Sequence, residues 1–343
     1  MKRIKHLLLL LLLLLVGCQQ KEPESFEPIS QNKFLLGTIV NITLYDNPQQ
    51  SIFDEIFTAI EEIETKMTIN NATTSEIIEI NHEAGNKAVK VSQETFDVIK
   101  TGLEYSKLSQ GRFDITVGPL VKLWEIGFED AHVPNPLKIE ESLTLINYEN
   151  VELNEDELTV KLTEPNMMID LGGIAKGYAA DVAASILKKH GNQQAIINLG
   201  GNVYAYGEKT NKETWKVGVQ NPFSLRGEYL GIAKVKNKSI VTSGTYERFF
   251  EQDGVTYHHI LDPKTGYPVE NGLMSVTIIA DSSMTADALS TIAFTLGIEE
   301  GLKLIESLED VEALYVTNDK LLYASSGFLN NFELTDQTFS IAN

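Results

Sequence analysis

The chain has 343 residues, with 28 Lys and Arg against 48 Asp and Glu, which gives a formal net charge of −20 at neutral pH. Nucleic acid is therefore excluded as an expected partner, because such a surface repels a phosphate backbone. A single cysteine excludes any disulfide within the chain, so stability must come from core packing and from ligands that bind the native state.

The first residues predict an export signal. Lys2, Arg3 and Lys5 precede an unbroken leucine run over residues 7–15. This run is shorter than the roughly 20 apolar residues that a transmembrane helix needs. A positive leader, a short apolar run and a small residue at its end are typical of a signal peptide, which we expect over residues 1–17.

The only cysteine, Cys18, stands where the apolar run stops. The segment therefore resembles a bacterial lipoprotein signal, with cleavage before Cys18 and lipid attached to it. The alternative is an uncleaved anchor with an incidental cysteine. Cleavage removes three positive charges and leaves 25 basic against 48 acidic residues, a net charge of −23. The lipid would hold the protein on the outer face of the cytoplasmic membrane.

Residues 18–32 are polar and acidic and contain proline, as suits a flexible tether. From residue 33 to about 335 we find no internal repeat, low-complexity tract or long linker. This length is enough for one large folded domain, which we expect to be a single compact catalytic unit.

Hydrophobic periodicity predicts the elements in chain order. A β-branched segment over residues 36–45 predicts a strand, and apolar spacings of three and four predict a helix over residues 51–67. Further helices are expected over residues 93–110 and 174–190, ended by Gly111 and Gly191. Short strands are expected at residues 195–199, 215–219, 229–235, 239–243, 255–261 and 275–280.

A fourth helix is expected over residues 285–296, with Ser282 or Ser283 as its N-cap and Gly297 as its terminator. Residues 311–317 and 321–326 read as a closing hairpin. This mixed order predicts an α+β fold with mixed or antiparallel sheets and packed helices, and argues against a doubly wound parallel sheet.

Two segments before residue 182 combine residue types that suit a ligand. In GRFDITVGPL, residues 111–120, an acid and an aromatic stand side by side where a helix ends. Asp114 could bind a ligand or could merely cap the next turn. In DLGGIAKGYAAD, residues 170–181, two glycines precede a helix whose N-terminus can attract an anion. The spacing is that of neither a dinucleotide fingerprint nor a P-loop.

Two later segments share this character. VTSGTY, residues 241–246, is followed by YHHILDPKTG, residues 257–266, in which Asp-Pro-Lys-Thr-Gly predicts a tight turn. His258 and His259 must point to opposite faces of a strand, so at most one readily faces a given site. A purely structural histidine remains the alternative.

In MTADALST, residues 284–291, Asp287 and Thr291 are four residues apart, so their oxygens lie on one helix face. Such hard oxygen ligands suit Mg²⁺ or Ca²⁺ and not zinc. The alternative is a capping aspartate with a threonine bonded back to its own helix.

Taken in order, DLGGIAKGYAAD, INLGGN, TSGTYERFF, HHILDPKTG and MTADALSTIAFTLG resemble the motifs of the ApbE-type flavin transferases, the FAD:protein FMN transferases. The similarity runs from Leu36 through the helix that ends near Gly297. Lipoprotein export is itself usual in that family. The resemblance implies a T-fold-like catalytic domain.

The resemblance also implies roles for individual residues. His259 would be the catalytic base, with His258 on the other face of the strand. Mg²⁺ would be held by Asp287, Thr291 and the backbone carbonyl of Gly173. The expected FAD contacts are Leu36, Asn70, Arg112, Phe113, Asp114, Asp170, Lys176, Ser243 and the backbone around Ile260.

Two of these positions depart from the family pattern. Leu36 stands where the family often has methionine before Gly-Thr, and Asn70 falls about where many members have an aromatic residue. Both positions would touch the flavin or the adenine, so the departures concern ligand affinity more than chemistry.

The implied function is Mg²⁺-dependent transfer of the FMN moiety of FAD to a threonine or serine hydroxyl of an extracytoplasmic acceptor protein. The products would be a phosphoester-linked flavoprotein and AMP. Two alternatives stay open. One is an exported FAD pyrophosphatase, in which water replaces the acceptor hydroxyl, and the other is a non-enzymatic lipoprotein that binds flavin or another solute.

Overall fold

The computed structural model describes residues 27–70, 73–209 and 212–342. The expected signal peptide, residues 1–17, and Cys18 lie outside the described residues, as does most of the expected tether. Strand β1 begins at Ile29, inside the segment expected to be a tether. The sequence placed this boundary too late because the strand is mostly exposed and carries polar side chains, so only its backbone pairing identifies it.

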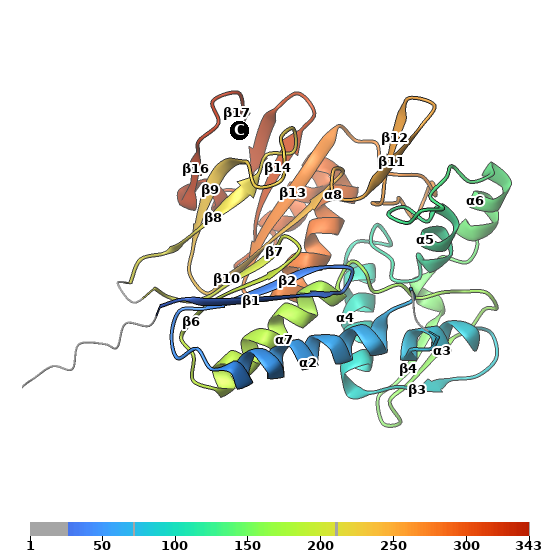
Figure 1. Cartoon of the computed structure of the whole chain (residues 1–343). Helices are drawn as coiled ribbons and strands as arrows, with labels where there is room; N and C mark the ends of the chain where they lie inside the picture. Colours follow the sequence, from blue (N-terminus) through green and yellow to red (C-terminus); the bar gives the residue numbers. More distant parts are fainter. Residues whose placement is uncertain (1–26, 71–72, 210–211, 343) are drawn as a thin grey trace, which may run out of the picture.

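A nine-stranded sheet forms the centre of the molecule, in the order β1-β2-β6-β7-β10-β13-β14-β15-β17 (Figure 1). All neighbouring strands are antiparallel except the last pair. The strands are β1 (Ile29–Leu35), β2 (Thr38–Leu44), β6 (Gln194–Leu199), β7 (Asn202–Gly207), β10 (Lys238–Gly244), β13 (Leu273–Ala280), β14 (Glu312–Thr317), β15 (Leu321–Ala324) and β17 (Ser340–Ile341).

Three small antiparallel sheets surround this one. The first joins β11 (Phe249–Gln252) to β12 (Val255–His258). The second has the order β16 (Phe332–Leu334), β9 (Tyr229–Val235) and β8 (Trp215–Gln220). The third has the order β3 (Val89–Lys90), β5 (Thr159–Leu162) and β4 (Val151–Asn154).

The helices pack against one face of the large sheet and beyond its end (Figure 1). They are α2 (Gln50–Met67), α3 (Glu76–His82), α4 (Gln93–Leu108), α5 (Gly118–Trp124), α6 (Pro136–Leu143), α7 (Ala175–Lys189) and α8 (Ser283–Glu306), with 3₁₀ turns η1 (Tyr148–Asn150) and η2 (Phe328–Asn331). Helix α7 contacts both α2 and α8, and α8 lies on β10 and β13. No helix within residues 27–70, 73–209 and 212–342 is both long and apolar enough to cross a bilayer.

Helix α8 corrects one expectation in part. Gly297 interrupts the helical geometry, with φ 78° and ψ −174°, but the chain resumes a helix that ends at Glu306. Ile305 is buried in this second part, so packing against the core sustains the helix beyond the glycine. At the other end Ser282, and not Ser283, is the N-cap, since its side chain accepts a hydrogen bond from the backbone N–H of Thr285.

The largest core lies between the sheet and the helices and includes Ile42, Ile56, Ala183 and Phe294. A second core fills the opposite face of the sheet beneath β8 and β9, and a third surrounds Trp124. The chain therefore forms one mixed α+β unit with antiparallel sheets, as the sequence predicts.

Candidate functional site

Helices α7 and α8 cross at backbone contact. A Cβ on Gly177 would lie 2.3 Å from the carbonyl oxygen of Ser283 and 2.6 Å from the Cα of Met284, so only glycine allows this approach. From one turn further along α7, the Asp181 carboxylate accepts the backbone N–H groups of Ser283 at 2.8 Å and Met284 at 2.9 Å. An acid from one helix thus binds the positive N-terminus of the other and fixes the crossing.

Asp287 lies just inside α8 and is only 4% exposed. One carboxylate oxygen accepts the backbone N–H of Gly177 at 2.9 Å, and the other lies 3.5 Å from the ammonium of Lys176. The residue expected to bind a metal and the lysine expected to bind FAD are therefore neighbours. Ser282 and Asp181 cap α8, so Asp287 does not cap its own helix, but through the Gly177 N–H it binds the first turn of α7.

Three hydroxyl groups gather beside Asp287. Ser243, at the end of β10, places its Oγ 2.8 Å from that of Ser290 and 3.4 Å from the Oγ1 of Thr291. Ser290 also donates to the backbone carbonyl of Asp287 at 2.8 Å. The sequence analysis missed Ser290, although its position three residues after Asp287 was a usable signal.

The residues expected to bind a metal offer ligand atoms that fit a hard divalent cation. Among residues 27–70, 73–209 and 212–342 no three His, Cys, Asp or Glu side chains cluster as a metal site. The carboxylate of Asp287, the hydroxyl of Thr291 and the carbonyl of Gly173 offer oxygen only. Mg²⁺ is commonly bound in this way, by one or two protein oxygens with water and substrate phosphates completing the shell.

The glycine-rich turn before α7 brings together three of the expected FAD contacts and metal ligands. Asp170 accepts the backbone N–H of Gly172 at 2.6 Å through its Oδ1. The ring of Phe113 lies 2.9 Å from where a Cβ would stand on Gly173, so a side chain there would clash with the ring. Asp170 and Gly173 therefore lie in one turn, and Phe113 packs against it from the segment after α4.

Cations gather around Asp170 although the chain as a whole is strongly acidic. Burial raises the pKa of the Asp170 carboxyl, while the positive charges of Lys122, Arg248 and Lys176 act to lower it. Lys122 and Arg248 were not found by the sequence analysis, because a lone basic residue reads as an ordinary exposed side chain. These three cations lie close enough to act on Asp170 and could bind an anionic ligand.

The two consecutive histidines have different environments. His258 is buried and its Nδ1 accepts the backbone N–H of Ile260 at 3.3 Å. Its Nε2 must then be the protonated nitrogen, which donates to the carbonyl of Val269 at 3.0 Å. Burial also lowers the pKa of His258, so this ring is a neutral structural element.

His259 is half-buried, and the carbonyl oxygen of Arg248 accepts its backbone N–H at 3.1 Å. The Nδ1 of its ring lies 3.2 Å from the same oxygen. Because a carbonyl only accepts, Nδ1 must carry the proton and Nε2 keeps its free lone pair. Burial, with the charge of Arg248 adding to it, lowers the pKa of His259 to about 3, so the ring is neutral at pH 7.

Asp114 is buried, and both of its carboxylate oxygens accept hydrogen bonds. It accepts the N–H of Thr116 at 2.8 Å, the hydroxyl of Thr116 at 2.7 Å and the N–H of Tyr148 at 3.1 Å. Burial raises the pKa of its carboxyl. These bonds favour the turn-capping role that the sequence left open.

Arg112 also makes a structural contact. It forms an ion pair of 3.2 Å with Asp262, whose Oδ1 accepts the N–H of Lys264 at 2.9 Å. Arg112 therefore ties its segment to the Asp-Pro-Lys-Thr-Gly turn that follows His259. The adjoining Ile260 is buried, and its carbonyl accepts the N–H of Val269 at 3.0 Å.

The two departures from the family pattern both lie near the C-terminal end of α2. Leu36 and Gly37 have φ of 53° and 67° and form the two-residue turn of the β1–β2 hairpin. The N–H of Leu36 donates to Glu64 at 3.0 Å. The Asn70 side-chain oxygen accepts from Lys122 at 2.6 Å, which connects it to the cations around Asp170.

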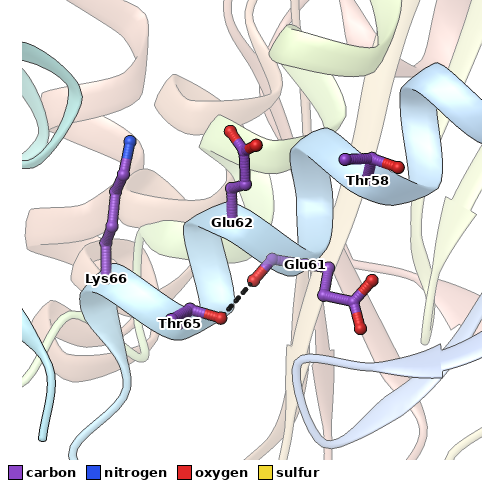
Figure 2. A pocket seen from close by; sticks show the side chains of 5 residues that line it. All are labelled: Thr58, Glu61, Glu62, Thr65 and Lys66. Carbon is purple, nitrogen blue, oxygen red and sulfur yellow. Dashed lines mark hydrogen bonds between the residues drawn. The ribbon is translucent and has the colours of Figure 1, made fainter.

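A shallow hollow on α2 is unrelated to these residues. Figure 2 shows the residues that line it, namely Thr58, Glu61, Glu62, Thr65 and Lys66. Its charges belong to surface ion pairs, Glu61 with Lys33 at 2.8 Å and Lys66 with Glu94 at 3.4 Å. This is an ordinary solvated helix face.

Residues 36–315 match the model of the ApbE family. The chain belongs to the ApbE family. The resemblance seen in the sequence is thereby confirmed, and the match covers every expected site residue except Cys18.

Curated relatives named FAD:protein FMN transferase match this chain over nearly their whole length. A Klebsiella pneumoniae protein named FAD:protein FMN transferase is 38% identical over 91% of this chain and 96% of its own. A Treponema pallidum protein of the same name is 35% identical over 90% of each chain.

Solved structures agree with the fold. The ApbE protein of Thermotoga maritima is 35% identical, with a TM-score of 0.82 over 89% of this chain and 99% of its own. The Vibrio cholerae flavin transferase ApbE is 29% identical, with a TM-score of 0.79 over 89% of this chain and 99% of its own. The α+β fold class is confirmed.

Proposed function

We propose that this ApbE-family protein transfers the FMN moiety of FAD to a threonine or serine hydroxyl of an acceptor protein outside the cytoplasm. Its relatives are named for FMN transfer from FAD to protein. The observation that carries the proposal is the position of Lys176. It contacts Asp287 at 3.5 Å, and its charge also acts on Asp170 and His259, so the oxygen ligands and the imidazole serve one region.

The substrate's charge explains the local cations. The diphosphate of FAD carries two negative charges, and a chain of net charge −20 would repel it. Lys122, Lys176 and Arg248 offset that repulsion, and the N–H groups of the glycine-rich turn assist. Asp287, Thr291 and the Gly173 carbonyl would hold Mg²⁺, which when bound neutralises charge at the phosphoryl oxygens.

The chemistry assigned to the chain itself is proton transfer at His259. Its free Nε2 takes the proton of the acceptor hydroxyl. The hydroxyl oxygen forms a bond to the FMN phosphorus while the bond from that phosphorus to the AMP oxygen breaks, and AMP leaves with the electron pair. The lowered pKa of His259 keeps Nε2 unprotonated at neutral pH, and the negative charge of a bound diphosphate would raise that pKa toward the range that suits a base.

The proposed location follows from the sequence of the leader. Lipid on Cys18 would hold the enzyme on the outer face of the cytoplasmic membrane, where exported acceptors are found. Expression of Cys18→Ser beside wild type tests this assignment. We expect the wild-type protein to carry lipid and to be found in the membrane fraction, and the variant to carry no lipid. Equal lipid labelling of the two proteins would contradict the assignment.

The test of activity incubates the purified domain with FAD, Mg²⁺ and an acceptor protein, followed by denaturation and detection of a flavin-fluorescent acceptor band. His259→Ala should abolish labelling while FAD still binds. His132→Ala is the matched control, since His132 is exposed and its ring bonds to the nearby carbonyl of Asp130, and it should label normally. Retained labelling in His259→Ala would remove the base role.

The metal assignment is tested separately. Asp287→Ala should raise the Mg²⁺ concentration needed for half-maximal labelling, and an unchanged titration curve would contradict it. FMN and AMP produced without any labelled acceptor would favour the pyrophosphatase alternative. FAD binding with neither product would favour a flavin-binding protein.

A further inference from the structure

Arg248 lies beside the candidate base, and besides its general positive charge it has a specific position. It immediately precedes β11, and its carbonyl oxygen accepts the backbone N–H of His259 at 3.1 Å and faces its Nδ1 at 3.2 Å. A shift of the Arg248 backbone would therefore move the His259 ring and disturb the hydrogen bond that fixes its tautomer.

The side chain of Arg248 extends from there along two glycines. Its Cδ lies 3.1 Å from where a Cβ would stand on Gly127, and its Nη2 lies 3.3 Å from the same point on Gly37. Both glycines have positive φ, 96° and 67°, so no side chain is expected at either position. The guanidinium therefore reaches the Leu36–Gly37 turn, which is an expected FAD contact.

The guanidinium is also available for a ligand. In the part of the chain that the structure describes, Arg248 makes no side-chain ion pair, whereas Arg112 is paired with Asp262. The side chain is exposed. Because its Nη2 stands beside Gly37 and its charge acts on both Asp170 and His259, this exposed guanidinium lies at the solvent edge of the site.

We propose that the guanidinium of Arg248 binds the phosphate on the FMN side of FAD, the one that the acceptor hydroxyl attacks. This inference rests on the proposed function. The base must face the attacked phosphorus, and Arg248 is the cation attached through its own backbone to that base. Lys176 lies at Asp287 instead, on the metal side.

An arginine suits this task better than a lysine. Its planar fork donates two parallel hydrogen bonds to phosphoryl oxygens. As the bond to the acceptor oxygen forms and the bond to AMP breaks, negative charge on those oxygens stays paired with the guanidinium. Removing one such donor from a transition state commonly lowers a rate by about 10²- to 10³-fold.

Binding measurements test the assignment without depending on transfer. The probes are FMN, AMP and riboflavin, measured by titration calorimetry against wild type, Arg248→Gln and Arg248→Lys. Arg248→Gln should weaken FMN binding about tenfold or more and leave AMP and riboflavin unchanged, since only FMN carries the contacted phosphate on a flavin. Arg248→Lys should recover part of the FMN affinity.

Arg226→Gln is the matched control. Arg226 is an exposed arginine whose side chain donates to the Gly200 carbonyl at 3.1 Å, and its loss changes the net charge equally. We expect it to bind all three probes as wild type does. An unchanged FMN affinity in Arg248→Gln, or a loss of AMP affinity in its place, would overturn the proposal.

Transfer kinetics give a second readout. Arg248→Gln should lower the labelling rate about 100-fold and move the acid limb of its pH profile to higher pH, because the positive charge that lowers the His259 pKa is gone. If wild type and Arg248→Gln label the acceptor equally well, the inference about Arg248 is refuted while the proposed function stands. If wild type labels no acceptor, the proposed function fails, and the three-probe comparison still decides the Arg248 contact.

Discussion

Replacing Gly177 by alanine tests the crossing of α7 and α8 on which the site depends. Alanine is the better helix former by at most about 1 kcal/mol, and by less in a first turn, so helix propensity alone predicts a gain in stability. Against this, the added Cβ would lie 2.3 Å from a backbone oxygen of Ser283. An unstrained contact is roughly 1 Å longer, so the helices must separate by about that amount.

Overpacking of this kind usually costs about 1–3 kcal/mol, and backbone atoms cannot rotate away as a side chain can. We therefore expect the free energy of unfolding of Gly177→Ala to fall by about 2 kcal/mol, measured by urea denaturation. The same separation would lengthen the 2.9 Å hydrogen bond from the Gly177 N–H to Asp287. The Mg²⁺ concentration for half-maximal labelling should therefore rise severalfold.

Ser185→Ala on the same helix is the control. Ser185 is exposed, and alanine there should raise stability by about 0.5 kcal/mol and leave the Mg²⁺ titration unchanged. A Gly177→Ala protein at least as stable as wild type, with an unchanged titration, would refute the reasoning about the crossing.

Three further predictions concern stability. Asp114→Ala should lower the free energy of unfolding by about 3 kcal/mol, because two backbone N–H groups lose a buried acceptor; a loss of FAD affinity without a loss of stability would show a ligand role instead. Trp124→Phe should cost about 2 kcal/mol, seen as a lower urea midpoint, because the buried indole N–H donates to the Gly266 carbonyl at 2.8 Å; an unchanged midpoint would contradict this. The lowered pKa of His259 means that the unfolded chain binds a proton that the native chain does not, so stability should fall as pH drops from about 6.5 toward 3, and a His259→Gln protein with the wild-type pH dependence would exclude His259 as a source of it.

The sequence predicted those elements whose side chains alternate between core and solvent. Helix α2 is an example, since its buried residues recur every three or four positions and set its limits within one residue. Strand β1 has no such pattern, because it is an exposed edge strand held by backbone pairing. Short helices such as α5 and α6 were likewise missed, because seven or eight residues give too few turns for a period to emerge.

At the site, sequence reasoning could propose a role only for residues that one motif holds close in the chain, such as Asp287 and Thr291 of α8. It failed where the fold alone brings groups together. Lys122 and Arg248 come from different segments and share only their effect on Asp170. Asp114 shows what a motif cannot reveal: hydrogen bonds from Thr116 and from the distant Tyr148 give this carboxylate a structural role besides the ligand role that the resemblance implies.

The long sequence separations within the site bear on how the polypeptide matures. Arg112 and Asp262 are 150 positions apart, and Lys176 and Asp287 are 111 apart. Contacts this distant form slowly, because the long loop between the two residues must close at an entropic cost before the contact can stabilise the fold. A chain truncated before α8 would contain His259 but would lack Asp287. Completion of the site therefore waits for α8, which brings Asp287 to Lys176.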